Sequence, residues 1–345
     1  MDASILSSHA RFTHPLEDVM TLISSDITVR PYTQDDFERI AAFHNLVEPD
    51  YPTTVGELRR NNSLRDPKLD YNLFLAERGG DLVGTARHTQ SPGLYHPQKF
   101  YLNIHVHPAH RRQGLGSRLY THLLDALKPF DPILLRGDAR EDRPDAVRFW
   151  QTRGFAEEDR YWESRFDPQT FDPAPYAHLD DKMRELGVDI APLSALMDAH
   201  PDYRRTLYNL DWEMTQDEPL PGTPTRKDFE VYEKYFDTSD FIPGALQVAV
   251  YRGAWRGFSE LAGAEGDAQS LYNGFTAVGA ELRGAGVATA LKVKNLVWAK
   301  ERGYTEIKTW NNARNAPMLA VNTKLGFVRQ PAEINFRKVL KEARG

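Results

Sequence analysis

Residues 106–116 read Val106-His107-Pro108-Ala109-His110-Arg111-Arg112-Gln113-Gly114-Leu115-Gly116, and this stretch decides the fold because it occurs twice. The second occurrence, an offset of 172 residues later, is Val278-Gly279-Ala280-Glu281-Leu282-Arg283-Gly284-Ala285-Gly286-Val287-Ala288. Downstream, Arg153-Gly154-Phe155 and Leu325-Gly326-Phe327 lie at the same offset. Two separated motifs in constant register indicate that a whole domain was duplicated.

Each occurrence places Arg-x-x-Gly-x-(Gly/Ala) between a predicted strand and a predicted helix. A helix N-terminus has unpaired N–H groups and a positive dipole end, and glycines let a phosphate approach the backbone closely. We therefore expect an anion site in each half. Neither copy fits the Gly-x-Gly-x-x-Gly dinucleotide motif or the Gly-Lys-Ser/Thr nucleotide motif. The expected ligands are Arg111, Arg112, Gln113, Gly114, Leu115, Gly116 and Ser117, then Arg283, Gly284, Ala285, Gly286, Val287, Ala288 and Thr289.

The hydrophobic patterns around the two turns repeat as well. In the first half they predict strands over 27–31, 72–76, 82–87, 100–107, 133–136 and 161–166, with helices over 115–127 and 146–152. In the second half they predict strands over 188–193, 246–251, 257–262, 274–278, 306–310 and 336–339, with helices over 287–300 and 317–324. We predict a tail with one short helix (1–26), a first domain (27–167), a linker rich in Pro and Asp (168–180) and a second domain (181–345).

Composition narrows the functional class. The chain has 345 residues, a formal net charge of −6 and no cysteine, which excludes disulfides and thiolate chemistry. Its 11 histidines are scattered without ligand spacing, so we expect no metal. No apolar run reaches the ~20 residues of a membrane span and no signal peptide is evident. We expect a cytoplasmic monomer or homodimer that binds neither nucleic acid nor membrane.

The motif Val-x-Pro-x-x-Arg-Arg-x-Gly-Leu-Gly, with Gly-Phe downstream, resembles the acetyl-CoA-binding core of the GNAT acyltransferase superfamily. The stretch Thr309-Trp310-Asn311, Asn315 through Asn322 and then Leu325-Gly326-Phe327 resembles GNAT members still more closely. The resemblance covers roughly residues 27–166 and 180–345.

The resemblance implies an α/β (α+β) fold of two GNAT-like domains. Each would have a mixed, mostly antiparallel central sheet, flanking helices and two splayed central strands that admit the pantetheine arm. The strand ending at Val106 or Val278 would pair with pantetheine, and the glycine turn would hold the pyrophosphate. An amine would then attack the acetyl thioester directly.

Two residues of the family's last helix differ here. The family often has an Asn that contacts CoA and, seven positions later, a Tyr that protonates the leaving thiolate. The N-half has Arg143 and Trp150 at these positions, and the C-half has Asn315 and Asn322. Because the C-half keeps the Asn, we favour it as the catalytic half, although Gly114-Leu115-Gly116 is the better phosphate turn.

Candidate catalytic groups follow from these positions. His105 lies on the strand beside the expected thioester, and an imidazole is suited to act as a general base. Glu260 is the base candidate of the C-half, and Asn322 occupies its acid position. We expect transfer of an acetyl group from acetyl-CoA, as co-substrate, to a primary amine of a small molecule. The alternative is an acyl-CoA-binding module or sensor in which one or both halves are non-catalytic.

Overall fold

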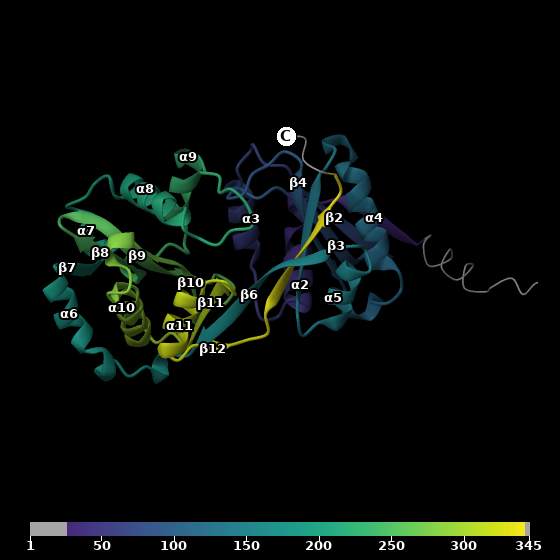
Figure 1. Ribbon diagram of the computed structural model, residues 1–345. Coiled ribbons are helices and arrows are strands. Elements are labelled where there is room, and N and C mark those ends of the chain that lie inside the picture. The colour runs from purple at the N-terminus through teal and green to yellow at the C-terminus, as the bar shows by residue number, and fades with distance from the viewer. Residues whose placement is uncertain (1–25, 342–345) are drawn as a thin grey trace, which may run out of the picture.

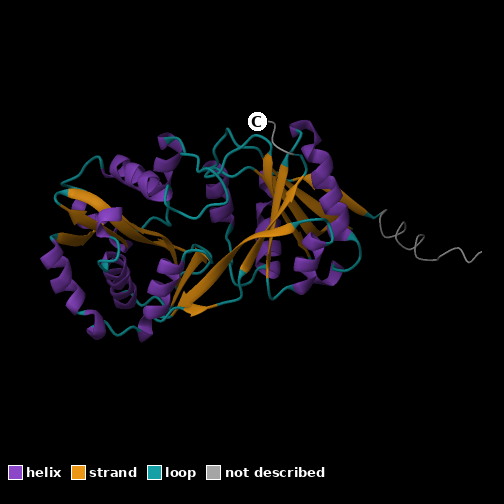
Figure 2. Ribbon diagram, in the orientation of Figure 1, coloured by secondary structure: helices purple, strands orange, loops and turns teal. Residues whose placement is uncertain are grey.

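One mixed sheet runs through both halves of the protein in a computed structural model that describes residues 26–341 (Figure 1). Its strand order is β1-β2-β3-β4-β5-β13-β6-β11-β10-β9-β8-β7, and β12 pairs with β6. Helices flank the sheet in both halves (Figure 2). The predicted α/β (α+β) class is confirmed, whereas the predicted tail helix lies outside the described residues.

The N-half contains six strands and four helices among its described residues. The strands are β1 (Ile27–Pro31), β2 (Tyr71–Arg78), β3 (Asp81–Thr89), β4 (Lys99–Val106), β5 (Leu134–Arg140) and β6 (Ala156–Phe166). The helices are α2 (Phe37–Val47), α3 (Val55–Ser63), α4 (Leu115–Leu127) and α5 (Pro144–Gln151).

The C-half repeats this order with additional helices. The strands are β7 (Val188–Pro192), β8 (Leu246–Tyr251), β9 (Ala254–Gly263), β10 (Ser270–Val278), β11 (Glu306–Asn312), β12 (Val328–Arg329) and β13 (Glu333–Val339). The helices are α6 (His178–Leu186), α7 (Leu193–Leu196), α8 (Tyr203–Thr215), α9 (Phe229–Tyr232), α10 (Val287–Glu301) and α11 (Ala316–Lys324).

The two central strands of each half separate along their length. β4 and β5 pair in parallel only from Lys99–Leu134 to Tyr101–Arg136, after which no pairing joins them. β10 and β11 likewise pair only from Ser270–Glu306 to Asn273–Thr309. Each half therefore has a gap between its central strands, next to the glycine turn.

The last strand of the chain does not stay in its own half. β13 is the yellow strand that runs into the N-half in Figure 1, and it pairs antiparallel with both β5 and β6. β6 in turn is long: its first part pairs with β13, and Tyr161–Phe166 pairs with β11 of the C-half. Each half's sheet is thus completed by a strand from the other half.

The hydrophobic cores follow this exchange. α4 buries Leu115, Leu119 and Leu123 at i, i+4 spacing against β3 and β4. Ile334 and Phe336 of β13 are 4% and 1% exposed within the same N-half core. The proposed linker (168–180) includes Phe171, which is buried in the C-half core.

Candidate active site

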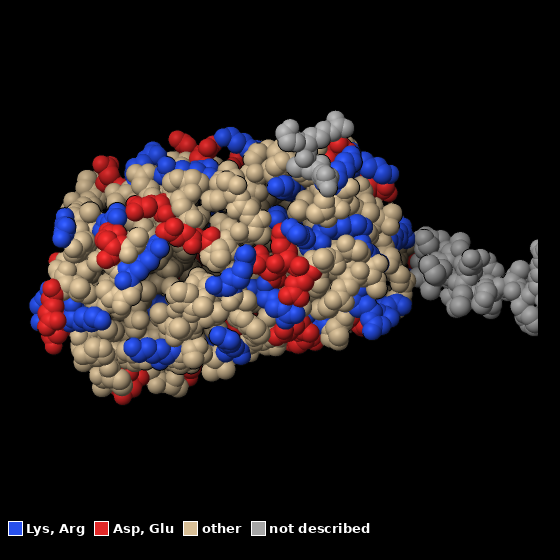
Figure 3. All heavy atoms as spheres, viewed as in Figure 1, with Lys and Arg blue, Asp and Glu red and all other residues tan. Residues whose placement is uncertain are grey.

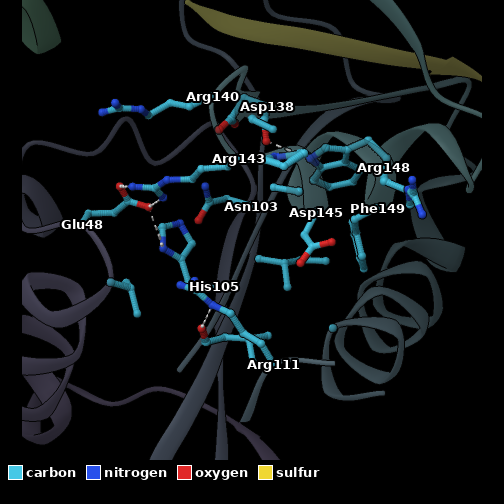
Figure 4. A pocket seen from close by; sticks show the side chains of 18 of the residues that line it. Glu48, Asn103, His105, Arg111, Asp138, Arg140, Arg143, Asp145, Arg148 and Phe149 are labelled. Atoms are coloured by element: carbon cyan, nitrogen blue, oxygen red, sulfur yellow. Dashed lines mark hydrogen bonds and ion pairs between the residues drawn. The ribbon is translucent and has the colours of Figure 1, made fainter. Parts of the chain in front are cut away.

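A cavity of about 980 Å³ opens at the gap between β4 and β5. It extends from the glycine turn at the start of α4, past the free edges of both strands, to the C-terminal end of α2 (Figure 4). Most of its wall belongs to the N-half, but Trp310, Pro331 and Glu333 come from the C-half. The strand exchange therefore contributes to this site directly.

The glycine turn of the N-half has the backbone that the sequence predicts. Gly114 is the N-cap of α4 with φ 83°, a left-handed conformation that favours glycine. A Cβ at Gly114 would meet nothing within 4 Å. The following first-turn amides of Leu115, Gly116 and Ser117 have no partners within the helix.

Side chains of this turn are held by nearby groups. Arg111 Nε donates to the carbonyl of Val106 (3.1 Å), and Gln113 Nε2 donates to the carbonyl of Ala109 (3.0 Å). Arg112 pairs with Asp145 at 3.2 Å, and all three side chains are exposed. The turn thus presents backbone amides and guanidinium groups to the mouth of the cavity.

Val106 presents its amide to the gap. The amide of His107 donates to Val83 of β3 at 2.9 Å. Since successive N–H groups point to opposite sides of a strand, the N–H of Val106 points away from β3 and toward the gap. A carbonyl oxygen lying along β4 could accept from it.

His105 lies beside Glu48 on the wall of the cavity (Figure 4). Its Nδ1 is 3.8 Å from Glu48 Oε1, and its ring stacks on His44 with centroids 6.4 Å apart. Burial lowers the pKa of the His105 imidazole from 6.5 to about 4. The ring is therefore neutral at pH 7 and has an acceptor nitrogen.

Glu48 and Arg143 form a two-point ion pair across the cavity (Figure 4). Arg143 Nη1 and Nη2 donate to the two carboxylate oxygens at 2.5 and 2.9 Å. Arg143 is the N-cap residue of α5 and Glu48 the C-cap residue of α2, so this pair joins two helix ends. No local sequence pattern indicates this pair, because its partners are 95 residues apart.

Trp150 fills the position where the family often has a tyrosine. It is 4% exposed, and its Nε1 donates to the carbonyl of Asp138 at 2.8 Å. A Cβ on Gly137 would lie 2.6 Å from its ring, so the indole packs directly on the backbone of β5. Trp150 offers no hydroxyl to the cavity.

Two carboxyl groups from different halves meet in the cavity wall. Asp138 of β5 and Glu333 of β13 interact through their side chains. Burial raises the pKa of Asp138, and burial together with the Asp138 carboxyl raises the pKa of Glu333 to about 8. Neither residue could be recognised from the sequence, since nothing in it pairs β13 with β5.

The glycine turn of the C-half has the same backbone conformation, but a helix packs close to it. Gly286 is the N-cap of α10 with φ 91°, and Arg283 Nε donates to the carbonyl of Val278 at 3.2 Å, as Arg111 does to Val106. A Cβ on Gly286, however, would lie 3.6 Å from Lys182 Nζ and 3.8 Å from Leu179, both on α6. α6 therefore lies close over this turn.

The hydroxyl side chains in the first turns of α4 and α10 also differ in exposure. Thr289 in the C-half is 7% exposed, whereas Ser117 in the N-half is exposed and accepts a hydrogen bond from Arg153 at 2.6 Å. The N-half turn is the more open of the two.

The other predicted C-half residues lie away from the N-half cavity. Glu260 accepts a hydrogen bond from the Tyr235 hydroxyl at 2.6 Å, and burial raises its pKa to about 7. Asn322 is 2% exposed and donates to Asn311 Oδ1 at 2.6 Å. Asn315 caps α11 by accepting from the amide of Met318 at 3.3 Å.

The described residues contain no group of three or more His, Asp or Glu side chains arranged to hold a metal ion. Over the same residues, no helix is both long and apolar enough to span a bilayer. On the face shown in Figure 3, acidic and basic side chains are interspersed.

Comparison with known proteins shows which family the N-half resembles and which fold the chain shares. Residues 37–155 match the model of the acetyltransferase (GNAT) family. A mycothiol acetyltransferase of Thermobispora bispora is 26% identical over 238 residues, covering 68% of this chain and 74% of the relative. That of Amycolatopsis mediterranei is 25% identical over 261 residues, covering 74% and 81%.

Two solved structures share the whole architecture. A GCN5-related N-acetyltransferase from Sphaerobacter thermophilus superposes with a TM-score of 0.70 at 17% identity, covering 93% of this chain and 98% of its own. A tandem GNAT protein from the clavulanic acid biosynthesis pathway superposes with a TM-score of 0.69 at 19% identity, covering 92% and 100%. The predicted tandem of two GNAT-like folds is confirmed.

Proposed function

We propose that this chain is a tandem GNAT N-acetyltransferase whose N-half binds acetyl-CoA and transfers the acetyl group to a primary amine of a small molecule. One observation carries the proposal. A single cavity connects the open glycine turn at Gly114 with the gap between β4 and β5. An extended ligand with an anionic end and a reactive end fits that shape.

The residues suit each part of acetyl-CoA. The pyrophosphate would lie on the amides of Leu115, Gly116 and Ser117, where the helix dipole favours negative charge. The pantetheine arm would follow the unpaired edge of β4, and the amide of Val106 would donate to the thioester oxygen as it becomes an oxyanion. The acceptor amine would enter from the side of Glu48 and His105.

We assign the C-half a supporting role. α6 lies over its turn. Trp310 of β11 corresponds to Asp138 of β5, because it follows Asp138 at the 172-residue offset of the repeat. The sequence favoured the C-half because of Asn315, but the side chain of Asn315 is bonded to its own helix. The cavity geometry favours the N-half.

A second candidate function is acyl-CoA binding without turnover. The observation that favours it is the absence of a hydroxyl at both family acid positions, Trp150 and Asn322. It differs from the first proposal in one measurable way, because a binding module releases no CoA in the presence of amines.

Calorimetric titration with acetyl-CoA tests the assignment. We expect one site, abolished by Gly114→Glu and retained in Gly286→Glu, because a carboxylate at Gly114 repels the pyrophosphate. Gly114→Ala is the matched control, since it carries the same left-handed backbone strain without the charge. Binding that survives Gly114→Glu contradicts the N-half assignment, and no binding to the wild type contradicts acetyl-CoA as co-substrate.

CoA release with a panel of primary amines then separates the two functions. Steady release with at least one amine is expected for the transferase. Acetyl-CoA binding without release from any amine supports the binding module instead.

A further inference from the structure

We infer that Glu333, delivered by the exchanged strand β13, forms with Asp138 the proton-transferring group of the N-half site, in place of the tyrosine that the last helix lacks. The inference rests on the proposed function, because it assumes that the amine and the thioester meet in the cavity at the β4–β5 gap. It makes the C-terminal strand a part of the N-terminal active site.

The register of the sheet brings the two carboxyls together. Glu333 lies opposite Arg140 of β5, and Asn335 lies opposite Asp138. Glu333 and Asp138 are therefore diagonal neighbours on one face, within reach of each other's side chains. That face is also the face of Arg136, the last β5 residue paired with β4. Asp138 thus stands two residues into the gap, where the thioester would lie.

The surroundings leave this pair short of positive charge. The groups that act on Glu333 from the packed elements are Asp138 on β5, Glu48 at the C-terminal end of α2 and Glu163 on β6. Its cross-strand neighbours are Arg140 and Tyr161. Glu48 is neutralised by Arg143, and Glu163 by Arg165 at 2.5 Å. Arg140 forms its ion pairs with Asp142 and Asp50 instead of with Glu333.

Among the described residues, neither Asp138 nor Glu333 forms an ion pair, and Arg87 is the cation that acts on Asp138 from a greater distance. Two neighbouring carboxyls without strong cationic partners cannot both ionise readily, so they hold one proton between them near neutral pH. Such a pair carries one basic oxygen and one acidic proton at once.

This pair can perform both proton transfers of the reaction. The carboxylate takes a proton from the acceptor's ammonium, which frees the nitrogen lone pair to form the C–N bond. When the C–S bond breaks, its electron pair goes to sulfur, and the carboxylic acid returns the proton to form the CoA thiol. The second proton on the acylated nitrogen leaves to solvent, so the net reaction releases one proton.

Trp150, which stands where the family often has a tyrosine, packs on the face of β5 opposite the Asp138 side chain. Its indole packs against Gly137 and donates to the carbonyl of Asp138, which fixes the backbone of β5 at this residue. The helix thus supplies a packing group that positions the carboxyl, where the family's tyrosine would supply the proton itself.

The test combines a titration that needs no acceptor with a kinetic profile. In the full-length protein labelled with ¹³C at side-chain carboxyls, we expect one glutamate carboxyl to titrate near pH 8, and its signal to disappear in Glu333→Gln. With the panel amine that gives the fastest CoA release, we expect Glu333→Gln to lower kcat by about 10²-fold and to lose the fall in rate above pH 8. The KM for acetyl-CoA should stay unchanged.

Asp138→Asn should reproduce this loss, and Glu333→Asp should restore part of the rate together with the alkaline fall. Glu157→Gln is the matched control, because Glu157 is an exposed glutamate of β6, the strand next to β13, and pairs with Arg160 of its own strand. A Glu333 carboxyl that titrates below pH 5, or a Glu333→Gln enzyme with the wild-type pH profile, overturns the inference. Failure of every amine would instead count against the proposed function, while the carboxyl titration still decides the state of the pair.

Discussion

His105 is the residue whose protonation should couple the site to the stability of the fold. Its pKa is about 4 in the folded protein and 6.5 in the unfolded chain. Between these values the unfolded chain binds more protons, so folding stability falls as pH decreases from 6.5 to 4. The full effect is on the order of 3 kcal/mol, at 1.36 kcal/mol per pKa unit.

We therefore expect His105→Gln to flatten the decline in unfolding free energy between pH 6.5 and 4, as measured by urea denaturation at several pH values. His178→Gln serves as the control, because His178 is exposed on the surface of the C-half. Equal pH dependence of wild type and His105→Gln would show that His105 is not held neutral by burial.

The glycines of the two turns could be predicted from the sequence, whereas the groups around the reacting atoms could not. Gly114 and Gly286 follow a strand and open a helix, and both adopt the positive φ that such a turn needs. Glu48, Arg143 and Glu333 belong to the site through contacts between segments far apart in the chain. A local pattern carries no information about such distant partners.

At the scale of elements, the segment before α3 packs against the β9–β10 loop of the other half. Thr54 Oγ1 donates to Glu265 at 2.5 Å, and Arg60 of α3 forms an ion pair with the same carboxylate. A Cβ on Gly266 would lie 1.9 Å from the carbonyl oxygen of Pro52, so the backbones touch here without room for a methyl group.

Gly266→Ala should therefore force these elements apart and lower the unfolding free energy by about 1–3 kcal/mol, as overpacking does. Thermal and urea denaturation measure the change. Gly93→Ala is the control, since a Cβ there meets nothing within 4 Å and its φ is ordinary. An unchanged melting temperature for Gly266→Ala would mean that the two elements are not in fixed contact.

The repeated order of strands and helices was predictable because each element carries its own hydrophobic period. The helix over Leu115–Leu127 and the strand over Leu246–Tyr251 have their predicted bounds. The partners of β6 and β13 were not predictable in this way. Consecutive strands usually pair within one domain, and nothing in the local pattern of Glu333–Val339 distinguishes a strand that crosses to the other half.

At the scale of the whole molecule, the exchange means that neither half has a complete sheet alone. A fragment of residues 1–176 lacks β13, which leaves the edges of β5 and β6 unpaired. It also loses Ile334 and Phe336 from its core, at about 1.5–3 kcal/mol each for full burial. That loss is comparable with the ~5–15 kcal/mol that stabilises a typical domain.

We expect the fragments 1–176 and 177–345 to be insoluble or to unfold without a cooperative transition when each is expressed alone. Expressed together, they should associate, because β13 can enter the N-half sheet without a covalent connection at residue 176. The associated pair should recover acetyl-CoA binding, and Glu333→Gln in the second fragment should leave that binding intact while lowering kcat. A fragment 1–176 that melts cooperatively and binds acetyl-CoA alone would show that β13 is dispensable for the N-half, and that the two halves are independent domains.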